Sequence, residues 1–306
     1  MTGQRRVGFV GLGSMGGALA ARLVHRTDLT VFDLDLGRAA PLVAAGAQAA
    51  ASLPELARRC DTVITCLPTS QHVRAVADGA DGLIDQLEPG SLVIDSTSGD
   101  PAVTRDLART FAARGIVLVD APVSGGPQAA AAGTIAILVG ADTEGFQRAT
   151  SVLRFISPNV RHVGGIGSGH SVKLLNNALA AGHRLLAFEA AAIAAANGVD
   201  PREFVDAVNV SSGRSYATEV TMPRHVFGER LDQGFSLGLM SKDLGLACGL
   251  IGAGLDGMSM VARVHELVTS ALGRLGPATD VNRLIELYEA AACVTVATGD
   301  RTAVPP

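Results

Sequence analysis

Residues 6–26, RVGFVGLGSMGGALAARLVHR, combine three local patterns that decide the fold. The apolar run at 6–10 predicts a short buried strand, the glycines of 11–16 a tight turn, and the apolar positions of 17–26 a helix packed on a sheet. Such a turn lets backbone amides approach a pyrophosphate, whose charge the helix N-terminus stabilises. The alternative is a glycine-rich turn without a ligand. We expect a dinucleotide to contact the loop residues Gly11, Leu12, Gly13, Ser14, Met15 and Gly16.

An acidic residue ends the next predicted strand, DLTVFDLD at 28–35. Asp33 lies 20 residues beyond Gly13, the spacing at which this type of fold places an acid on the ribose of the dinucleotide. Its carboxylate would accept hydrogen bonds from ribose hydroxyls and would repel a 2′-phosphate. The sequence therefore predicts NAD as the cofactor in preference to NADP.

Strand and helix patterns keep alternating up to about residue 165. An amphipathic helix at 101–115 has proline in its first turn and glycine after its end. This alternation predicts an α/β fold with a mostly parallel, doubly wound sheet of the Rossmann type over residues 1–165. Further strands are expected at 61–68, 90–98, 116–122 and 133–141.

Ligands of such sheets bind at the carboxyl ends of the strands. Leu67, Pro68 and Thr97 follow two of the predicted strands. We expect them to line the ribose and nicotinamide of NAD, although each is also consistent with a simple turn at the end of a strand.

The loop VSGGPQAAAAGT at 123–134 has almost no side chains at its start. Ser124 offers a hydroxyl, and Gly125 and Gly126 offer consecutive backbone amides, an arrangement that suits an anion such as a substrate carboxylate. A flexible turn without a ligand is the competing interpretation.

Helical patterns replace strands after the glycine-rich segment 159–169, which we expect to join two domains. One long helix is predicted from about 168 to 197, and an all-helical domain for substrate binding and oligomerisation over 166–306. Alanine-rich faces on the long helix favour close contacts between helices and self-association of the chain. Shorter helices are expected at 201–210, 238–253, 258–274 and 279–297.

The chain has 23 arginines but only two lysines, Lys173 and Lys242. Lys173 and Asn177 are four residues apart and share one face of the long helix, among apolar neighbours. An isolated lysine in that setting commonly extends its ammonium group to solvent. The use of arginine almost everywhere else indicates instead a site where the cation must be able to lose its proton, which an arginine cannot do.

A dehydrogenase needs such a group, because the substrate hydroxyl releases a proton as hydride leaves for the nicotinamide. We expect Lys173 to be this general acid/base, and Asn177 to hold the substrate hydroxyl or orient the lysine. Neither Tyr216 nor Tyr288 is followed by lysine four residues later, so the Tyr–Lys pair of short-chain dehydrogenases is absent from the sequence.

Two other cations are candidates for ligand contacts. Lys242, in SKDLGLA at 241–247, would reach the cofactor or the substrate, or would simply pair with the next aspartate at a helix start. Arg214 lies in SSGRSYATE at 211–219, which we expect to break helical structure and to line the substrate pocket. It would pair with a distal carboxylate, sulfonate or phosphonate, or would face solvent.

The composition excludes several classes of protein. With a net charge of −4 and a pI of about 6.0, the chain has no electrostatic footprint for nucleic acid. No uninterrupted apolar run approaches the roughly 20 residues of a membrane span, and Arg22 interrupts the N-terminal run before a signal-peptide cleavage site. The four cysteines lack metal-ligand spacing. We therefore expect buried free thiols, no metal, no membrane contact and a cytoplasmic location.

Four motifs follow one another along nearly the whole chain: GLGSMG at 11–16, DAPVSGG at 120–126, GSGHSVKLLNN at 167–177 and KDLGLA at 242–247. Together they resemble the β-hydroxyacid dehydrogenase family, which includes 3-hydroxyisobutyrate dehydrogenase, tartronate semialdehyde reductase, L-threonate dehydrogenase and, more distantly, 6-phosphogluconate dehydrogenase. The resemblance implies a Rossmann domain, an all-α C-terminal domain, a dimer or tetramer, and NAD-dependent hydride transfer to or from a small 3-hydroxy acid or its semialdehyde.

The resemblance also implies residue roles. It assigns catalysis to Lys173, the substrate to Ser124, Gly125, Gly126 and Asn177, and the vicinity of the nicotinamide to Thr97 and Lys242.

Departures from the family and rival functions bear on this interpretation. Leu19 and Arg22 stand where the family commonly has methionine and asparagine, which leaves the phosphate loop intact. Asn176 stands where 6-phosphogluconate dehydrogenase has histidine, which argues against a sugar-phosphate substrate. An imine reductase or a catalytically inactive binding module would share the fold, but such relatives usually lack the lysine at position 173.

Overall fold

The computed structural model describes residues 5–255 and 257–298. The chain forms two compact units, Met1–Lys173 and Leu174–Pro306. The domain boundary expected at 165/166 stays a prediction.

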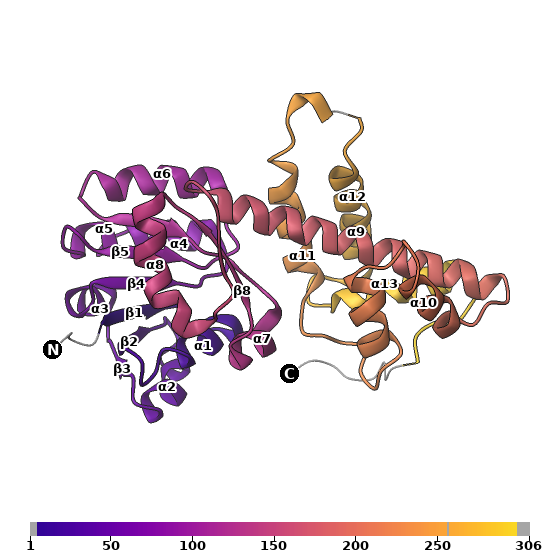
Figure 1. Ribbon diagram of the computed structural model, residues 1–306, viewed down its shortest axis with the longest axis horizontal. Coiled ribbons are helices and arrows are strands. Elements are labelled where there is room, and N and C mark those ends of the chain that lie inside the picture. Colours follow the sequence, from indigo (N-terminus) through magenta and orange to yellow (C-terminus); the bar gives the residue numbers. More distant parts are fainter. Residues whose placement is uncertain (1–4, 256, 299–306) are drawn as a thin grey trace. The chain divides into compact units, whose positions relative to one another are not determined.

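The first unit is built on one sheet (Figure 1). Its strands are β1 (Arg6–Val10), β2 (Asp28–Phe32), β3 (Gln48–Ala49), β4 (Thr62–Thr65), β5 (Leu92–Asp95), β6 (Val117–Asp120), β7 (Val123–Ser124), β8 (Ala136–Gly140) and β9 (Val160–Gly164). In the described part of the chain they are ordered β3-β2-β1-β4-β5-β6-β8-β7, with β9 beside β8. Pairing is parallel from β3 to β6 and between β8 and β9, and antiparallel where β8 meets β6 and β7. The predicted doubly wound, mostly parallel sheet is confirmed.

Helices cover both faces of this sheet, because the strands present apolar side chains to both. In β1, Val7 and Phe9 belong to one core and Val10 to the other. The first core also contains residues of α1 (Ser14–Ala21), α2 (Ala40–Ala44), α7 (Gly126–Ala132) and α8 (Thr143–Ile156). The second contains residues of α3 (Leu53–Arg59), α4 (Ser70–Asp78), α5 (Leu83–Gln86) and α6 (Pro101–Ala112). A 3₁₀ turn, η1 (Leu36–Ala39), precedes α2.

Parallel pairing brings the carboxyl ends of β1, β4, β5 and β6 to one edge of the sheet. The chain leaves β1 toward β2 on one side, and β4 lies on the other side of β1, so the strand order reverses between β1 and β4. Open parallel sheets bind their ligands at such a reversal, beyond the carboxyl ends of the strands.

The segment 159–169, which we expected to join two domains, contains a strand that was not predicted. Val160–Gly164 forms β9 and pairs in parallel with β8. Its Arg161 and His162 are exposed and it ends in glycine, a composition that suits an edge strand and lacks the apolar run used to recognise buried strands.

The second unit is helical, as predicted. Its helices are the long α9 (Ser168–Ala196), which starts in the first unit, α10 (Pro201–Asn209), a π-helix η2 (Ala217–Val226), α11 (Leu237–Cys248), the 3₁₀ turns η3 (Ala253–Leu255) and η4 (Val281–Arg283), α12 (Met260–Leu275) and α13 (Leu284–Ala292). They enclose one hydrophobic core around Phe188 of α9, Leu244 of α11 and Val268 of α12.

The helix η2 corrects the expectation that 211–219 only breaks helical structure. It starts at Ala217 and continues through Pro223, a residue that normally ends a helix. Met222 and Val226 are fully buried in the helical core, and this burial outweighs the local preference.

The long helix α9 passes a length and composition test for crossing a membrane, which buried core helices of soluble proteins also pass. It buries Phe188 and Ala191 but exposes Leu179, Leu186 and Ile193, which are seven residues apart. The expected oligomer and the cytoplasmic location stay predictions.

All four cysteines are free thiols. Cys60 is buried and Cys66 and Cys248 are partly buried, but Cys293 is exposed, so the expectation of buried thiols was wrong for Cys293. Burial raises the pKa of the Cys60 thiol to about 11 and that of Cys66 to about 12. Both are therefore poor nucleophiles near neutral pH.

Candidate active site

The loop after β1 depends on two of its glycines for its own conformation. Gly11 has a φ of +93°, and a Cβ there would overlap the carbonyl oxygen of Cys66 after β4. A Cβ on Gly16 would overlap the carbonyl oxygen of Gly11. These two glycines let the loop fold tightly against the end of β4.

Gly13 is different, because the protein itself leaves room for a side chain there. Its φ is −61°, and a Cβ would meet only the terminal Nη1 of Arg38, at 3.6 Å. Gly13 is the N-cap of α1, and among the described residues no side chain caps this helix. A small residue and uncapped amides at a helix N-terminus fit a pyrophosphate that approaches the backbone closely.

Asp33 is held against this loop. Its Oδ2 accepts the N–H of Leu12 at 2.6 Å, and its Oδ1 accepts the N–H of Asp35 at 2.9 Å. A carboxylate offers about four acceptor positions, so ribose hydroxyls can still bind. The guanidinium of Arg38 lies 3.9 Å from Asp33 and 3.3 Å from Asp35, which places a cation beside the acid.

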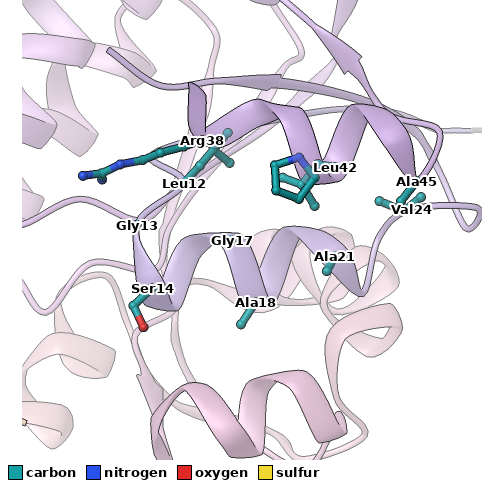
Figure 2. A pocket seen from close by; sticks show the side chains of 11 residues that line it. Leu12, Gly13, Ser14, Gly17, Ala18, Ala21, Val24, Arg38, Leu42 and Ala45 are labelled. Atoms are coloured by element: carbon teal, nitrogen blue, oxygen red, sulfur yellow. The ribbon is translucent and has the colours of Figure 1, made fainter. Parts of the chain in front are cut away.

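A cleft of about 510 Å³ begins at this loop. Figure 2 shows Gly13 and Ser14 at one end and Val24 and Ala45 at the other, with α1 along one side. It is lined by Leu12, Gly13, Ser14, Gly17, Ala18, Ala21, Val24, Arg38, Pro41, Leu42 and Ala45.

The residues after β4 and β5 join the same edge. The N–H of Leu67 donates to the Thr97 hydroxyl at 3.1 Å, and the N–H of Thr97 donates to Asp95 at 3.0 Å. The side chain of Leu67 also abuts Gly11, where an added Cβ would come within 2.8 Å of it. The structure thus brings together Gly11, Leu67 and Thr97, while Pro68 is exposed beside them.

The loop after β6 is shaped by two more glycines. Ser124 pairs with Ala136 in the sheet, and Gly125 and Gly126 have φ values of +139° and +77°. L-residues rarely adopt this conformation, so the turn requires glycine. Its proposed contact with a substrate carboxylate stays a prediction.

Lys173 lies in the second turn of α9 and is only 9% exposed. This burial is greater than that of a lysine extended freely into solvent, and it favours a buried polar role. Four residues later on the same helix, Asn177 donates from its Nδ2 to Asp243 Oδ2 at 2.7 Å.

Asp243 was not among the residues predicted for the site, but it contacts two of them. It is 3% exposed, and its Oδ1 lies 3.0 Å from the Nζ of Lys242. Lys242 thus pairs with the next aspartate, as the alternative interpretation expected, but in the second turn of α11 and not at its start. Asp243 therefore joins two predicted site residues, Asn177 and Lys242, in the second unit.

Arg214 is not part of that group. It is exposed in the segment between α10 and η2, and no hydrogen bond or ion pair among the described residues connects it to the other predicted site residues.

Two family profiles together match nearly all of the folded chain. The profile described as the NAD binding domain of 6-phosphogluconate dehydrogenase matches residues 6–164. The profile described as NAD-binding of NADP-dependent 3-hydroxyisobutyrate dehydrogenase matches residues 167–288. The chain belongs to the β-hydroxyacid dehydrogenase family.

Named members of the family cover the chain closely. The 2-(hydroxymethyl)glutarate dehydrogenase of Eubacterium barkeri is 35% identical over 96% of this chain and 98% of its own. The NAD-dependent L-serine dehydrogenase of Pseudomonas aeruginosa is 37% identical over 79% and 84%. The structure of Mycobacterium tuberculosis 3-hydroxyisobutyrate dehydrogenase with L-serine has a TM-score of 0.84 and 28% identity, covering 94% and 99%.

This β-hydroxyacid dehydrogenase is an oxidoreductase that transfers a hydride between a nicotinamide cofactor and a small hydroxy acid. The phosphate loop and the Asp33 carboxylate fit such a cofactor on the geometry given above. The roles of Lys173, Ser124, Asn177 and Lys242 in binding or catalysis stay predictions.

Substitution should distinguish Gly13, where the protein leaves room for a side chain, from Gly16, which the conformation of the loop requires. Gly13→Ala should keep the thermal midpoint of unfolding within about 2 °C, because a methyl group fits there. It should raise the Kd for NAD at least about tenfold, because the methyl group occupies the space of the pyrophosphate. Calorimetry and fluorescence titration with NAD measure the two effects.

Gly16→Ala is the matched control. Its methyl group overlaps the backbone of Gly11, so the midpoint should fall by about 5 °C or more. If Gly13→Ala bound NAD as tightly as the natural protein, the loop would not be the pyrophosphate site.

Proposed function

We propose that this enzyme oxidises a small 3-hydroxy acid to its semialdehyde, or reduces the semialdehyde, with NAD as cofactor and Lys173 as the general acid/base. The observation that carries the proposal is the burial of Lys173 in the second turn of α9, in a chain that uses arginine for 23 of its 25 cations. A buried lysine can exchange a proton with a substrate, whereas a buried arginine stays protonated.

The chemistry divides between the cofactor and the protein. When bound, the nicotinamide supplies the hydride acceptor. As the C–H electron pair leaves the carbinol carbon, the hydroxyl proton passes to Nζ of Lys173, and the C–O bond becomes a carbonyl. In the reverse direction Lys173 returns the proton to the carbonyl oxygen.

Other residues would orient the substrate. The amide of Asn177, held by Asp243, would fix the reacting hydroxyl or the lysine. The hydroxyl of Ser124 and the amides at Gly125 and Gly126 would bind the carboxylate.

The proposed substrate class follows from the chemistry of three relatives' substrates. 3-Hydroxyisobutyrate, 2-(hydroxymethyl)glutarate and L-serine each carry a hydroxymethyl group on the carbon next to a carboxylate. They differ only in the third substituent on that carbon. We propose the same HOCH₂–CHR–COO⁻ unit for this enzyme, with Arg214 as a candidate partner for an anionic R group.

A panel of acids followed by NADH absorbance tests this class. 3-Hydroxyisobutyrate, 2-(hydroxymethyl)glutarate, L-serine and 3-hydroxypropionate present the unit or its unsubstituted form, and lactate presents a hydroxyl on the wrong carbon. Turnover should occur with at least one of the first four, and kcat/KM for lactate should be at least about 100-fold lower, because its hydroxyl cannot reach the same position. Lactate oxidised as efficiently as the best 3-hydroxy acid would contradict the proposal.

NAD in preference to NADP is supported by the position of Asp33. Its carboxylate lies beside the loop where a 2′-phosphate would add negative charge, although Arg38 is close enough to offset part of this repulsion. One relative is named as NAD-dependent and one matching family profile is described as that of an NADP-dependent enzyme, so the preference has to be measured on this chain.

Asp33→Asn tests the preference while keeping an acceptor for the Leu12 amide. The natural protein should bind NAD at least about tenfold more tightly than NADP, and the substitution should remove most of that ratio. Asp35→Asn is the control, because Asp35 also faces Arg38 but is largely exposed, and it should leave the ratio unchanged. Equal binding of NAD and NADP by the natural protein would remove the role proposed for Asp33.

A further inference from the structure

The start of α9 is anchored by a buried aspartate from the sheet. Asp120, the last residue of β6, is fully buried. Its Oδ1 accepts the N–H of Gly167 at 2.7 Å and its Oδ2 accepts the N–H of His170 at 2.8 Å. The Gly167 amide lies just before α9 and the His170 amide lies in the first turn of α9. Asp120, at the end of β6, therefore caps the start of this helix.

Two glycines pack directly against this carboxylate. A Cβ on Gly140 or on Gly169 would overlap the Asp120 carboxylate or the backbone beside it. Burial raises the pKa of the Asp120 carboxyl, against the opposing effects of His170 and the two N–H donors. The Asp120 carboxylate that holds the start of α9 is therefore buried and closely packed, unlike an exposed helix cap.

The imidazole of His170 forms a second anchor in the same turn. It is fully buried, its Nδ1 lies 2.8 Å from the hydroxyl of Thr104 on α6, and its Nε2 lies 3.8 Å from Oδ2 of Asp95. The Thr104 hydroxyl also lies 3.0 Å from the carbonyl of Asp100, and its proton can serve either contact.

The other ring nitrogen of His170 lies against the end of β5. Nε2 faces a buried carboxylate and has no hydrogen-bond partner among the described residues. The tautomer that carries its proton on Nε2, and accepts from Thr104 at Nδ1, directs an N–H toward Asp95, and this geometry favours it. The contact is an electrostatic attraction between α9 and the carboxyl end of β5.

Asp95 connects the imidazole to the edge of the sheet where the cofactor is expected. Its Oδ1 accepts the Thr65 hydroxyl at 2.9 Å and the Thr97 amide at 3.0 Å. Thr97 in turn accepts the amide of Leu67 at 3.1 Å. One buried network thus runs from the loops after β4 and β5 to His170, which lies one helical turn before Lys173.

We propose that His170, with Asp95 and Asp120, is a positioning residue of the reaction: the network fixes the first turns of α9, and with them Lys173, relative to the loops at Leu67 and Thr97. The proposal rests on the role of Lys173 proposed above. His170 itself takes no part in proton transfer to the substrate. A displacement of a reacting group by about 1 Å can lower the rate about 100-fold.

Two substitutions at His170 test this. His170→Leu removes both polar contacts and should lower kcat about 100-fold while leaving KM for NAD within about twofold, because the phosphate loop is untouched. His170→Gln keeps an amide donor toward Asp95 and should recover kcat to within about tenfold of the natural enzyme. His162→Leu is the control: His162 lies in the same unit and contacts the Ala141 carbonyl, outside the network, and its loss should leave kcat unchanged.

Amide hydrogen exchange of the peptide covering residues 168–175 reports the anchoring without using catalysis. His170→Leu should accelerate exchange there at least about tenfold, and His162→Leu should not. In a Lys173→Ala background, His170→Leu should have no further effect on the residual rate, because both changes act through the same lysine.

Two results would overturn the proposal: a kcat for His170→Leu equal to that of His162→Leu, or a fall in kcat without faster exchange at 168–175. If the proposed role of Lys173 is wrong, the results differ from those two. Lys173→Ala keeps the turnover of the natural enzyme, while amide exchange at 168–175 in His170→Leu still rises.

Discussion

Parallel pairing of β1, β4, β5 and β6 forces the last residues of four strands onto one edge of the sheet, and the functional features of the first unit depend on this constraint. Gly11, Leu67 and Thr97 follow three of those strands and become neighbours, and Asp120 ends the fourth strand. The loops after these strands lie side by side, and the sheet fixes their positions relative to one another. Such a row of loops can bind both a long cofactor and a small substrate.

The carboxylates of this edge bind backbone amides and so join segments that are distant in sequence. Asp33 holds the turn at Leu12, Asp95 holds Thr97, and Asp120 holds the start of α9. In the second unit, Asp243 does the same for the side chain of Asn177. Each of these acids is mostly buried, where a hydrogen bond to a charged group is worth more than at the surface and where its loss leaves an unpaired partner.

Much of the fold was predictable because its signals are local. The glycines at 11–16 and the acid at 33 lie within one strand–helix–strand unit, and Lys173 stands out by its rarity against arginine. The edge strand β9 and the helix η2 were missed because Arg161 and Pro223 point locally to other structures, and tertiary contacts decide against them. Asp243 and the contact between Asp95 and His170 could not be found, because their partners lie 66 or more residues away.

The central claim is that Lys173 transfers the proton of the substrate hydroxyl. Lys173→Ala assayed with added primary amines tests it most directly, with tetramethylammonium as a cation of similar size that cannot transfer a proton. The account predicts that amines restore turnover, that the restored rate changes systematically with the basicity of the amine, and that tetramethylammonium has no effect. A variant that binds NAD normally but is rescued by no amine, or equally by tetramethylammonium, would contradict it.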